Sequence, residues 1–240
     1  METTDAMVRE LVHRRHRRRR HLVVSLVAVL VVVGAALVGA GLVRANNTAP
    51  DKAPSRVPAG AAADKSGLAA STGAVRVDLH LDYLCPECRC TERALTAALK
   101  ELRSDGGVSV VYHPVAFLDD RSRPAGYSTR AASAAACAAD EGKFERYSTV
   151  LFAEQPAEQG PGLDEDRLIA AGRDAGITGA SFARCVKDAP YRPWVRYVSD
   201  LAASRKVALT PTAVVAGRRV DVTGSDPAAA LTRAVTEARR

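Results

Sequence analysis

The longest hydrophobic segment of the chain lies near its N-terminus. Residues 22–43 contain only Val, Leu, Ala, Gly and one Ser, with no charged side chain. A run of this length can cross a bilayer as a helix. Residues 13–21, directly before it, are all His or Arg. The positive-inside rule therefore predicts a cytoplasmic tail at residues 1–21 and an extracytoplasmic location for everything after Arg44. The expected protein is a single-pass protein of the cell membrane.

A cleaved signal peptide is the alternative interpretation of this segment. The apolar core of a signal peptide has only about 7–15 residues and is followed by a site of small residues. The apolar run is longer here, and Val43-Arg44-Ala45 is a poor cleavage site. An uncleaved anchor is therefore favoured.

Residues 44–72 show no periodic apolar pattern. They contain Pro50, Pro54 and Pro58 together with many alanines. This composition is typical of a flexible tether. The remainder, residues 73–240, is then expected to form the folded domain.

The first part of this domain has a strand–helix–strand pattern. Residues 75–82 alternate between apolar and polar side chains, which predicts a strand with one polar face rather than a strand covered on both faces. Cys85-Pro86 opens a helix whose leucines recur at helical spacing: Leu95, Leu99 and Leu102. Residues 108–112 form the second strand. This order implies a parallel crossover.

The second part begins with a mostly helical block at about residues 124–206. Helical spacing recurs over 131–139, 144–152, 168–175, 181–186 and 194–206. A hairpin follows at residues 213–222, turning at Gly217-Arg218-Arg219, and residues 228–238 form a last helix. The whole pattern is α/β, with a helical insertion between a βαβ half and a ββα half.

Charge distribution argues against nucleic-acid binding by this domain. The formal charge of the chain is +7, but residues 1–21 hold seven Arg against three acidic residues. From Gly73 onward there are 23 basic and 22 acidic residues. The high isoelectric point is thus a property of the tail, and no basic face is indicated.

Three of the five cysteines fall within six residues, Cys85, Cys88 and Cys90. At the start of a helix, unpaired N–H groups stabilise the thiolate of the first cysteine. Cys88, one turn further, can close or resolve a mixed disulfide. Pro86 is tolerated in the first turn because its missing N–H would be unpaired there. An extracytoplasmic location allows disulfides to persist.

Metal binding is the alternative use of these sulfurs. Cys85, Cys88 and Cys90 could bind a soft metal, with His80 or His113 as a fourth ligand. A zinc ribbon would normally supply a second C-x-x-C, which the sequence lacks. The redox interpretation is therefore favoured, and no metal is assigned.

A family resemblance adds to this interpretation. The segment Asp82-Tyr83-Leu84-Cys85-Pro86-Glu87-Cys88, the triplet Thr210-Pro211-Thr212 and the βαβ, helical block, ββα order resemble the thioredoxin superfamily. The helical insertion resembles the DsbA-like branch of extracytoplasmic thiol–disulfide oxidoreductases, in its membrane-anchored bacterial type. The resemblance covers residues 74–240, and residues 112–119 fit it too.

The resemblance implies a role for each residue of the site. Cys85 corresponds to an exposed attacking cysteine and Cys88 to a buried resolving cysteine. Pro211 corresponds to a cis-proline that faces the pair, and Thr210 supplies backbone groups to a bound peptide. X-Pro is the bond at which a cis form is cheap enough for a fold to hold it.

The implied activity is exchange of disulfides with the thiols of secreted proteins. No organic cofactor is implied, because the dithiol is itself the reactive group. A membrane redox partner is implied for recycling: a quinone-coupled protein for an oxidase, an electron-transferring one for a reductase. A non-catalytic interaction module is a weaker alternative, since such modules usually lack one of the two cysteines.

Two residues depart from the family pattern. Leu79 stands six residues before Cys85, where thioredoxin-like proteins often carry a buried acid. Glu87 lies between the two cysteines, where its charge should raise the pKa of Cys85 and make the protein a weaker oxidant. Alternatively, Glu87 points to solvent and contributes little.

The remaining cysteines lie elsewhere. Cys137 and Cys185 are 48 residues apart in the helical block and are either two buried thiols or a structural disulfide. The oxidising compartment, and similar second disulfides in some members of the family, favour the disulfide. Cys90 lies about 200° around the helix from Cys88 and is expected to lie outside the redox pair. It is a packed thiol, an intermolecular partner or an accidental substitution, and the packed thiol is the default expectation.

Overall fold

The computed structural model describes residues 52–240. The predicted tail and membrane anchor, residues 1–21 and 22–43, lie outside these residues. Within residues 52–240, no helix has the length and apolar character needed to cross a membrane.

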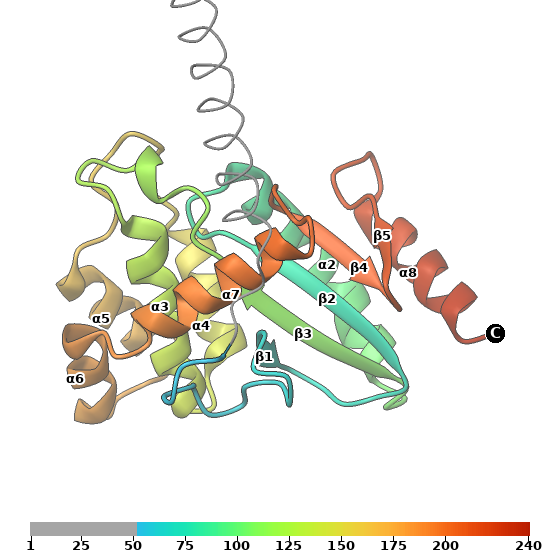
Figure 1. Cartoon of the computed structure of the whole chain (residues 1–240), viewed down its shortest axis with the longest axis horizontal. Coiled ribbons are helices and arrows are strands. Elements are labelled where there is room, and N and C mark those ends of the chain that lie inside the picture. The colour runs from blue at the N-terminus through green and yellow to red at the C-terminus, as the bar shows by residue number, and fades with distance from the viewer. Residues whose placement is uncertain (1–51) are drawn as a thin grey trace, which may run out of the picture. The chain divides into compact units, whose positions relative to one another are not determined.

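A five-stranded mixed sheet forms the centre of the domain (Figure 1). Its strand order is β1-β3-β2-β4-β5. β2 pairs in parallel with β3, and the other pairs are antiparallel. The strands are β1 Leu68–Ala69, β2 Val75–Leu81, β3 Val108–Pro114, β4 Thr212–Val215 and β5 Arg218–Val220.

The helices follow the predicted order. α2 (Pro86–Arg103) connects the two parallel strands, and α8 (Pro227–Ala238) ends the fold. Five helices and one short 3₁₀ turn, η1 (Asp119–Arg121), lie in sequence between β3 and β4. These helices are α3 Tyr127–Asp140, α4 Phe144–Ala153, α5 Glu165–Asp174, α6 Ala180–Asp188 and α7 Arg192–Ser204. The expected α/β fold with a helical insertion is confirmed for the described residues. In Figure 1 the insertion lies on the β3 side of the sheet and α8 on the β5 side.

Two hydrophobic cores hold the domain together. The first packs α2 and α8 on one face of the sheet, through residues such as Val77, Leu79, Leu95, Leu99 and Leu231. The second fills the insertion, with the large buried side chains Tyr127, Tyr147, Phe152 and Trp194. Burial of each such side chain removes it from water and contributes roughly 1.5–3 kcal/mol.

The expectation of a polar face along residues 75–82 is wrong at the C-terminal end of β2. His80 is 4 % exposed and Asp82 is fully buried. His80 stacks on its cross-strand neighbour His113, with ring centroids 4.3 Å apart. Asp82 in turn accepts a hydrogen bond from Ser128 of α3. Burial of these polar side chains depends on partners far away in the sequence.

The predicted tether is also wrong in its C-terminal part. Residues 58–70, here called the N-terminal strap, pack on the domain instead of forming free chain. Leu68 is 2 % exposed and lies in the second core. Its strand, β1, pairs with β3.

Two further contacts hold the strap. The indole N–H of Trp194 donates to the Lys65 carbonyl at 3.0 Å. A ring nitrogen of His113 lies 2.6 Å from the Ser66 carbonyl. The folded unit therefore begins before residue 73.

Candidate active site

The two cysteines of the C-x-x-C motif lie at the N-terminus of α2. Cys85 is the N-cap residue, and its sulfur accepts a hydrogen bond from the Cys88 backbone N–H at 3.3 Å. Pro86 occupies the first turn. Both cysteines are free thiols. The end of the helix thus directs an N–H group and the positive end of its dipole at the Cys85 sulfur.

These surroundings shift the two thiols in opposite directions. A hydrogen bond from the Cys88 thiol, as the largest cause, lowers the pKa of Cys85, and the Cys88 backbone N–H adds to this effect. Burial strongly raises the pKa of Cys88, and the adjacent Cys85 raises it further. The arrangement therefore favours a thiolate on Cys85 beside a protonated Cys88.

Cys85 is less accessible than an exposed attacking cysteine would be. It is 3 % exposed, and Cys88 is fully buried. The Thr210 carbonyl lies against the Cys85 sulfur at 3.3 Å and accepts its S–H. The segment before β4 thus covers the sulfur, which explains why the expected exposure is wrong. The structure shows a closed arrangement of the site.

The predicted proline lies in this covering segment. The Thr210–Pro211 peptide bond is cis. The contact between the Thr210 carbonyl and Cys85 brings together residues 125 positions apart. Thr210 and Pro211 therefore lie at the same site as the C-x-x-C pair.

Glu87 contacts the site rather than pointing only to solvent. Its carboxylate oxygen lies 3.8 Å from the Cys85 sulfur. Its negative charge opposes the factors that lower the pKa of Cys85. The Cys85 pKa is nevertheless lowered overall, so the hydrogen bonds outweigh this repulsion.

The residues considered for a metal site are not brought together. Cys90 is exposed on α2, so the expectation that it is a packed thiol is wrong. His80 and His113 stack on each other, and His113 is bound to Asp78 at 2.7 Å. Among residues 52–240, no three His, Cys, Asp or Glu side chains form a cluster suited to a metal ion.

Two polar residues of the site were not predicted from the sequence. Asp82 lies below the loop that leads to Cys85, and its carboxylate accepts hydrogen bonds from Leu84 N, Leu118 N and Ser128 Oγ at 2.9, 2.9 and 2.6 Å. Burial raises its pKa to about 6, although these three donors oppose the shift. Asp82 begins the segment 82–88 that carries the family resemblance, and this position was a signal for a role in the site. The alternation of residues 75–82 instead predicted an exposed side chain.

Gln155 is the second such residue. It comes from the loop between α4 and α5, and its amide nitrogen donates to the carbonyls of Tyr83 and Cys85 at 3.0 and 2.9 Å. The insertion thereby fixes the backbone on which Cys85 stands. No local sequence signal identifies Gln155, because its partners lie 70 and 72 residues away.

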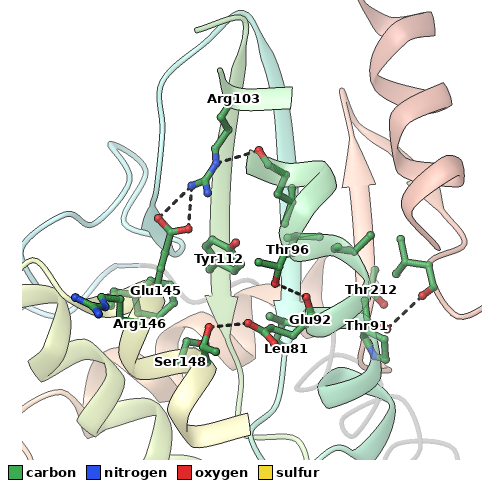
Figure 2. Close-up of a pocket in the computed structure, with 17 residues that line it drawn as sticks. Leu81, Thr91, Glu92, Thr96, Arg103, Tyr112, Glu145, Arg146, Ser148 and Thr212 are labelled. Atoms are coloured by element: carbon green, nitrogen blue, oxygen red, sulfur yellow. Dashed lines mark hydrogen bonds and ion pairs between the residues drawn. The ribbon is translucent and has the colours of Figure 1, made fainter. Parts of the chain in front are cut away.

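A cavity of about 160 Å³ lies between α2, α4 and the sheet (Figure 2). Its apolar wall includes Leu79, Leu81, Leu95, Leu99, Tyr112 and Phe144. Two polar bridges join α2 to α4 along its rim: Arg103 with Glu145 at 2.9 Å, and Thr149 with Glu92 at 2.8 Å. Pro211 and Thr212 also line it, so the cavity and the sulfur pair share the cis-proline segment.

The other two cysteines are joined. Cys137 of α3 and Cys185 of α6 form a disulfide that closes a loop of 48 residues. Cys137 is 1 % exposed. This bridge lies within the insertion and is separate from the C-x-x-C pair.

The fold and the facing cysteine and proline segments define the thioredoxin class. A family described as Thioredoxin matches residues 70–235. The chain therefore belongs to the thioredoxin family, in its DsbA-like branch.

Two solved structures from Mycobacterium tuberculosis are similar to the chain. The reduced form of the disulfide bond oxidoreductase DsbG is 37 % identical, with a TM-score of 0.57 over 67 % of this chain and 76 % of that chain. Oxidised DsbA is 34 % identical, with a TM-score of 0.54 over 68 % of this chain and 89 % of that chain.

A curated relative matches over a shorter stretch. The serine/threonine-protein kinase PknE of M. tuberculosis is 29 % identical over 86 residues, or 36 % of this chain. The match spans only 15 % of the length of that kinase.

Proposed function

We propose that the protein is a thiol–disulfide oxidoreductase that exchanges disulfides with secreted proteins through Cys85 and Cys88. The observation that carries this proposal is the hydrogen bonding of the Cys85 sulfur. It accepts the N–H of Cys88 at the start of α2 and lies against the Thr210 carbonyl. The similarity to DsbG and DsbA, which are named for this chemistry, supports the proposal.

The proposed reaction has two exchange steps. In the reducing direction, the Cys85 thiolate attacks a substrate disulfide, a new sulfur–sulfur bond forms, and the second substrate sulfur leaves as a thiolate. Cys88 then loses its proton and attacks Cys85, which forms the Cys85–Cys88 disulfide and releases the substrate thiolate. In the oxidising direction the same steps run in reverse.

The reduction potential of the Cys85–Cys88 pair sets the net direction of electron flow between the protein and its substrate. A stabilised Cys85 thiolate stabilises the reduced protein and makes its disulfide a stronger oxidant. A quinone-coupled membrane protein would recycle an oxidase, and an electron-transferring one a reductase. Measurement of the reduction potential against glutathione distinguishes these two partners, since potentials near those of strong oxidants indicate disulfide formation.

Substitution of the two cysteines tests the assigned roles. We expect Cys85→Ser to abolish exchange with a peptide disulfide, because the thiol with the lowered pKa is lost. We expect Cys88→Ser to accumulate mixed disulfides with Cys85, because the resolving thiol is lost. Mass spectrometry of trapped adducts and a rate assay give the two readouts. Normal exchange by the Cys85 variant would remove the proposal.

The proposed location is outside the membrane, with residues 22–43 as a retained anchor. The exposed thiol of Cys90 provides a natural reporter when the reactive Cys85 is replaced by Ser in every protein compared. A membrane-impermeant maleimide should label Cys90 in intact cells, and the Cys90→Ala chain serves as the blank. Labelling only after lysis would contradict this topology. A mature N-terminus near Ala45 would instead indicate cleavage of the anchor.

A further inference from the structure

An open groove of about 660 Å³ lies on the exposed side of α2, close to the start of the helix. Five exposed residues of α2 and one half-buried side chain of the insertion line it: Pro86, Arg89, Cys90, Arg93, Ala94 and Gln155. Arg89 and Arg93 are the charged side chains of this set, and no carboxylate of residues 52–240 belongs to it. The groove therefore presents two cations to the solvent.

This groove begins at the reactive cysteine. Pro86 directly follows Cys85, and the Gln155 amide nitrogen donates to the Cys85 carbonyl at 2.9 Å. Residues four apart are neighbours on a helix surface, so Cys85, Arg89 and Arg93 follow one another along α2. The helical rise places Arg89 about 6 Å and Arg93 about 12 Å from Cys85 along the axis. Both guanidinium groups are thus within reach of a polypeptide bonded to the Cys85 sulfur.

The charges of the two arginines are not neutralised by the domain. Within residues 52–240, no carboxylate forms an ion pair with either side chain. The acids nearest in sequence have other contacts: Glu92 accepts a hydrogen bond from Thr149 at 2.8 Å, and Glu87 lies 3.8 Å from the Cys85 sulfur. Like charges four residues apart repel each other, and the dipole disfavours cations near a helix N-terminus. An anion bound against this pair would relieve both effects.

An extended polypeptide has a repeat that matches the spacing of the arginines. Alternate side chains point to the same side of an extended chain, and each pair of residues advances it by roughly 6.6 Å. Residues two and four positions from a cysteine bonded to Cys85 would therefore lie near Arg89 and Arg93. Residues three and five positions away would point to the opposite side.

We infer that Arg89 and Arg93 are specificity-determining residues that bind acidic side chains of a polypeptide substrate, two and four positions from its reacting cysteine. The ion pairs form while the substrate sulfur becomes bonded to Cys85 and the previous partner of that sulfur leaves as a thiolate. The carboxylates take no part in the bond exchange. This inference rests on the proposed exchange reaction and deepens it by naming a substrate class.

The expected effect is a preference for acids in one register over the same acids in another. An exposed ion pair changes a rate by roughly a factor of two, so two pairs correspond to about fourfold at low salt. Salt screens exposed charges, and the preference should therefore shrink toward one at high salt.

The test uses the full chain in detergent, reduced, with Cys90→Ala in every protein because the exposed Cys90 would also react. Two peptides have the same composition, with one central cysteine and four glutamates. The glutamates stand two and four positions to each side of the cysteine in one peptide, and three and five positions in the other. The cysteine is joined to thionitrobenzoate, whose release gives a coloured signal. Each protein is scored by the ratio of its two rates, in which partial misfolding and overall attraction between charges cancel.

We expect a ratio of about four for the unsubstituted chain and a ratio near one for the double variant Arg89→Gln with Arg93→Gln. Replacement of both arginines by Lys should keep a ratio clearly above one, because the charges remain. Lys100→Gln with Arg233→Gln is the matched control, since it removes the same two charges from exposed positions outside the groove and should keep the ratio.

Two sets of results separate this inference from the proposed function. A ratio of one in the unsubstituted chain, a ratio kept by the double Gln variant, or a ratio unchanged by salt overturns the inference alone. Failure of the chain to react with either peptide, or an equal rate for Cys85→Ser, overturns the proposed function itself.

Discussion

At the scale of single residues, the contrast between Cys85 and Cys88 arises from position on α2. The first residue receives hydrogen bonds from the end of the helix, and the second is buried one turn further in. Glu87 lies between them and contributes the main opposing charge. The thiolate on Cys85 is therefore a balance between donors that favour it and two opposing factors, burial of the sulfur and the weaker repulsion by the Glu87 carboxylate.

We predict that Glu87→Gln lowers the pKa of Cys85 further and makes the pair more oxidising. Removal of the negative charge stabilises the thiolate and so the reduced protein. Glu87 is exposed and screened by water, so the reduction potential should rise by roughly 10 mV. Redox equilibration with glutathione measures this change.

Glu101→Gln is the matched control for this prediction. It removes the same charge from an exposed position near the other end of α2 and should leave the potential unchanged. The effect of Glu87→Gln should also shrink at high salt, because salt screens exposed charges. A lowered potential in the Glu87 variant would contradict the assigned repulsion.

Asp82 provides a second prediction, for the pH dependence of stability. Burial raises its pKa from 3.8 to about 6, so the folded chain holds a proton that the unfolded chain releases in this range. Asp82 therefore stabilises the fold most at low pH, and this contribution is lost as the pH rises through about 6. Between pH 4 and 7 the loss amounts to roughly 2 kcal/mol.

The comparison of the unsubstituted chain with Asp82→Asn isolates this effect. The difference in their free energies of unfolding, measured in urea, should fall as the pH rises from 4 to 7. Asp174→Asn, at an exposed site, should give a difference that does not change with pH. Asp78 has a lowered pKa, so its contribution to stability changes with pH in the opposite direction. Asp78 is present in both proteins, and its contribution therefore cancels in the difference. A difference independent of pH would show that Asp82 ionises as freely as an exposed carboxyl.

At the scale of helices and strands, local patterns predicted most of the domain. The strands and helices lie close to their expected bounds, since strand alternation, leucine spacing and the helix start at Cys85-Pro86 are local signals. The burial of Asp82, the role of Gln155 and the docking of the strap were missed. Each depends on at least one partner that lies between 46 and 129 residues away, and periodicity carries no information on such contacts.

The disulfide between α3 and α6 provides the prediction at this scale. We expect the double variant Cys137→Ala with Cys185→Ala to lose up to about 4 kcal/mol of stability, because the unfolded chain regains the freedom of a 48-residue loop. Urea unfolding measures this loss. Cys90→Ala, which removes an exposed free thiol, should leave the stability unchanged. A double variant as stable as the unsubstituted chain would show that packing alone holds the insertion.

At the scale of the whole molecule, the strap joins parts of the chain that are distant in sequence. It pairs with β3, contacts His113 of the sheet and accepts a hydrogen bond from Trp194 of α7. Gly67 makes this approach feasible, because a Cβ atom there would lie 2.4 Å from the Tyr112 carbonyl oxygen. The end of the expected tether is thus part of the folded unit.

We predict that Gly67→Ala displaces the strap and destabilises the domain by roughly 2 kcal/mol. Trp194 is the only tryptophan in the chain, and its indole is bound to the strap, so its fluorescence should change with the displacement. Gly224→Ala is the control, since the nearest atom to its Cβ would lie at an ordinary 3.5 Å. Unchanged emission and stability in Gly67→Ala would show that the strap does not depend on this close approach.

The strand order has a consequence for a protein that exchanges disulfides with other polypeptides. Open sheet edges can recruit extended polypeptides into intermolecular β-pairing. One edge of this sheet is covered by the strap through the two-residue strand β1. The other edge is the three-residue strand β5, which carries the exposed Arg218 and Arg219. Short strands and charged side chains discourage such pairing. Both edges of the sheet are thereby protected against pairing with extended chains from other molecules.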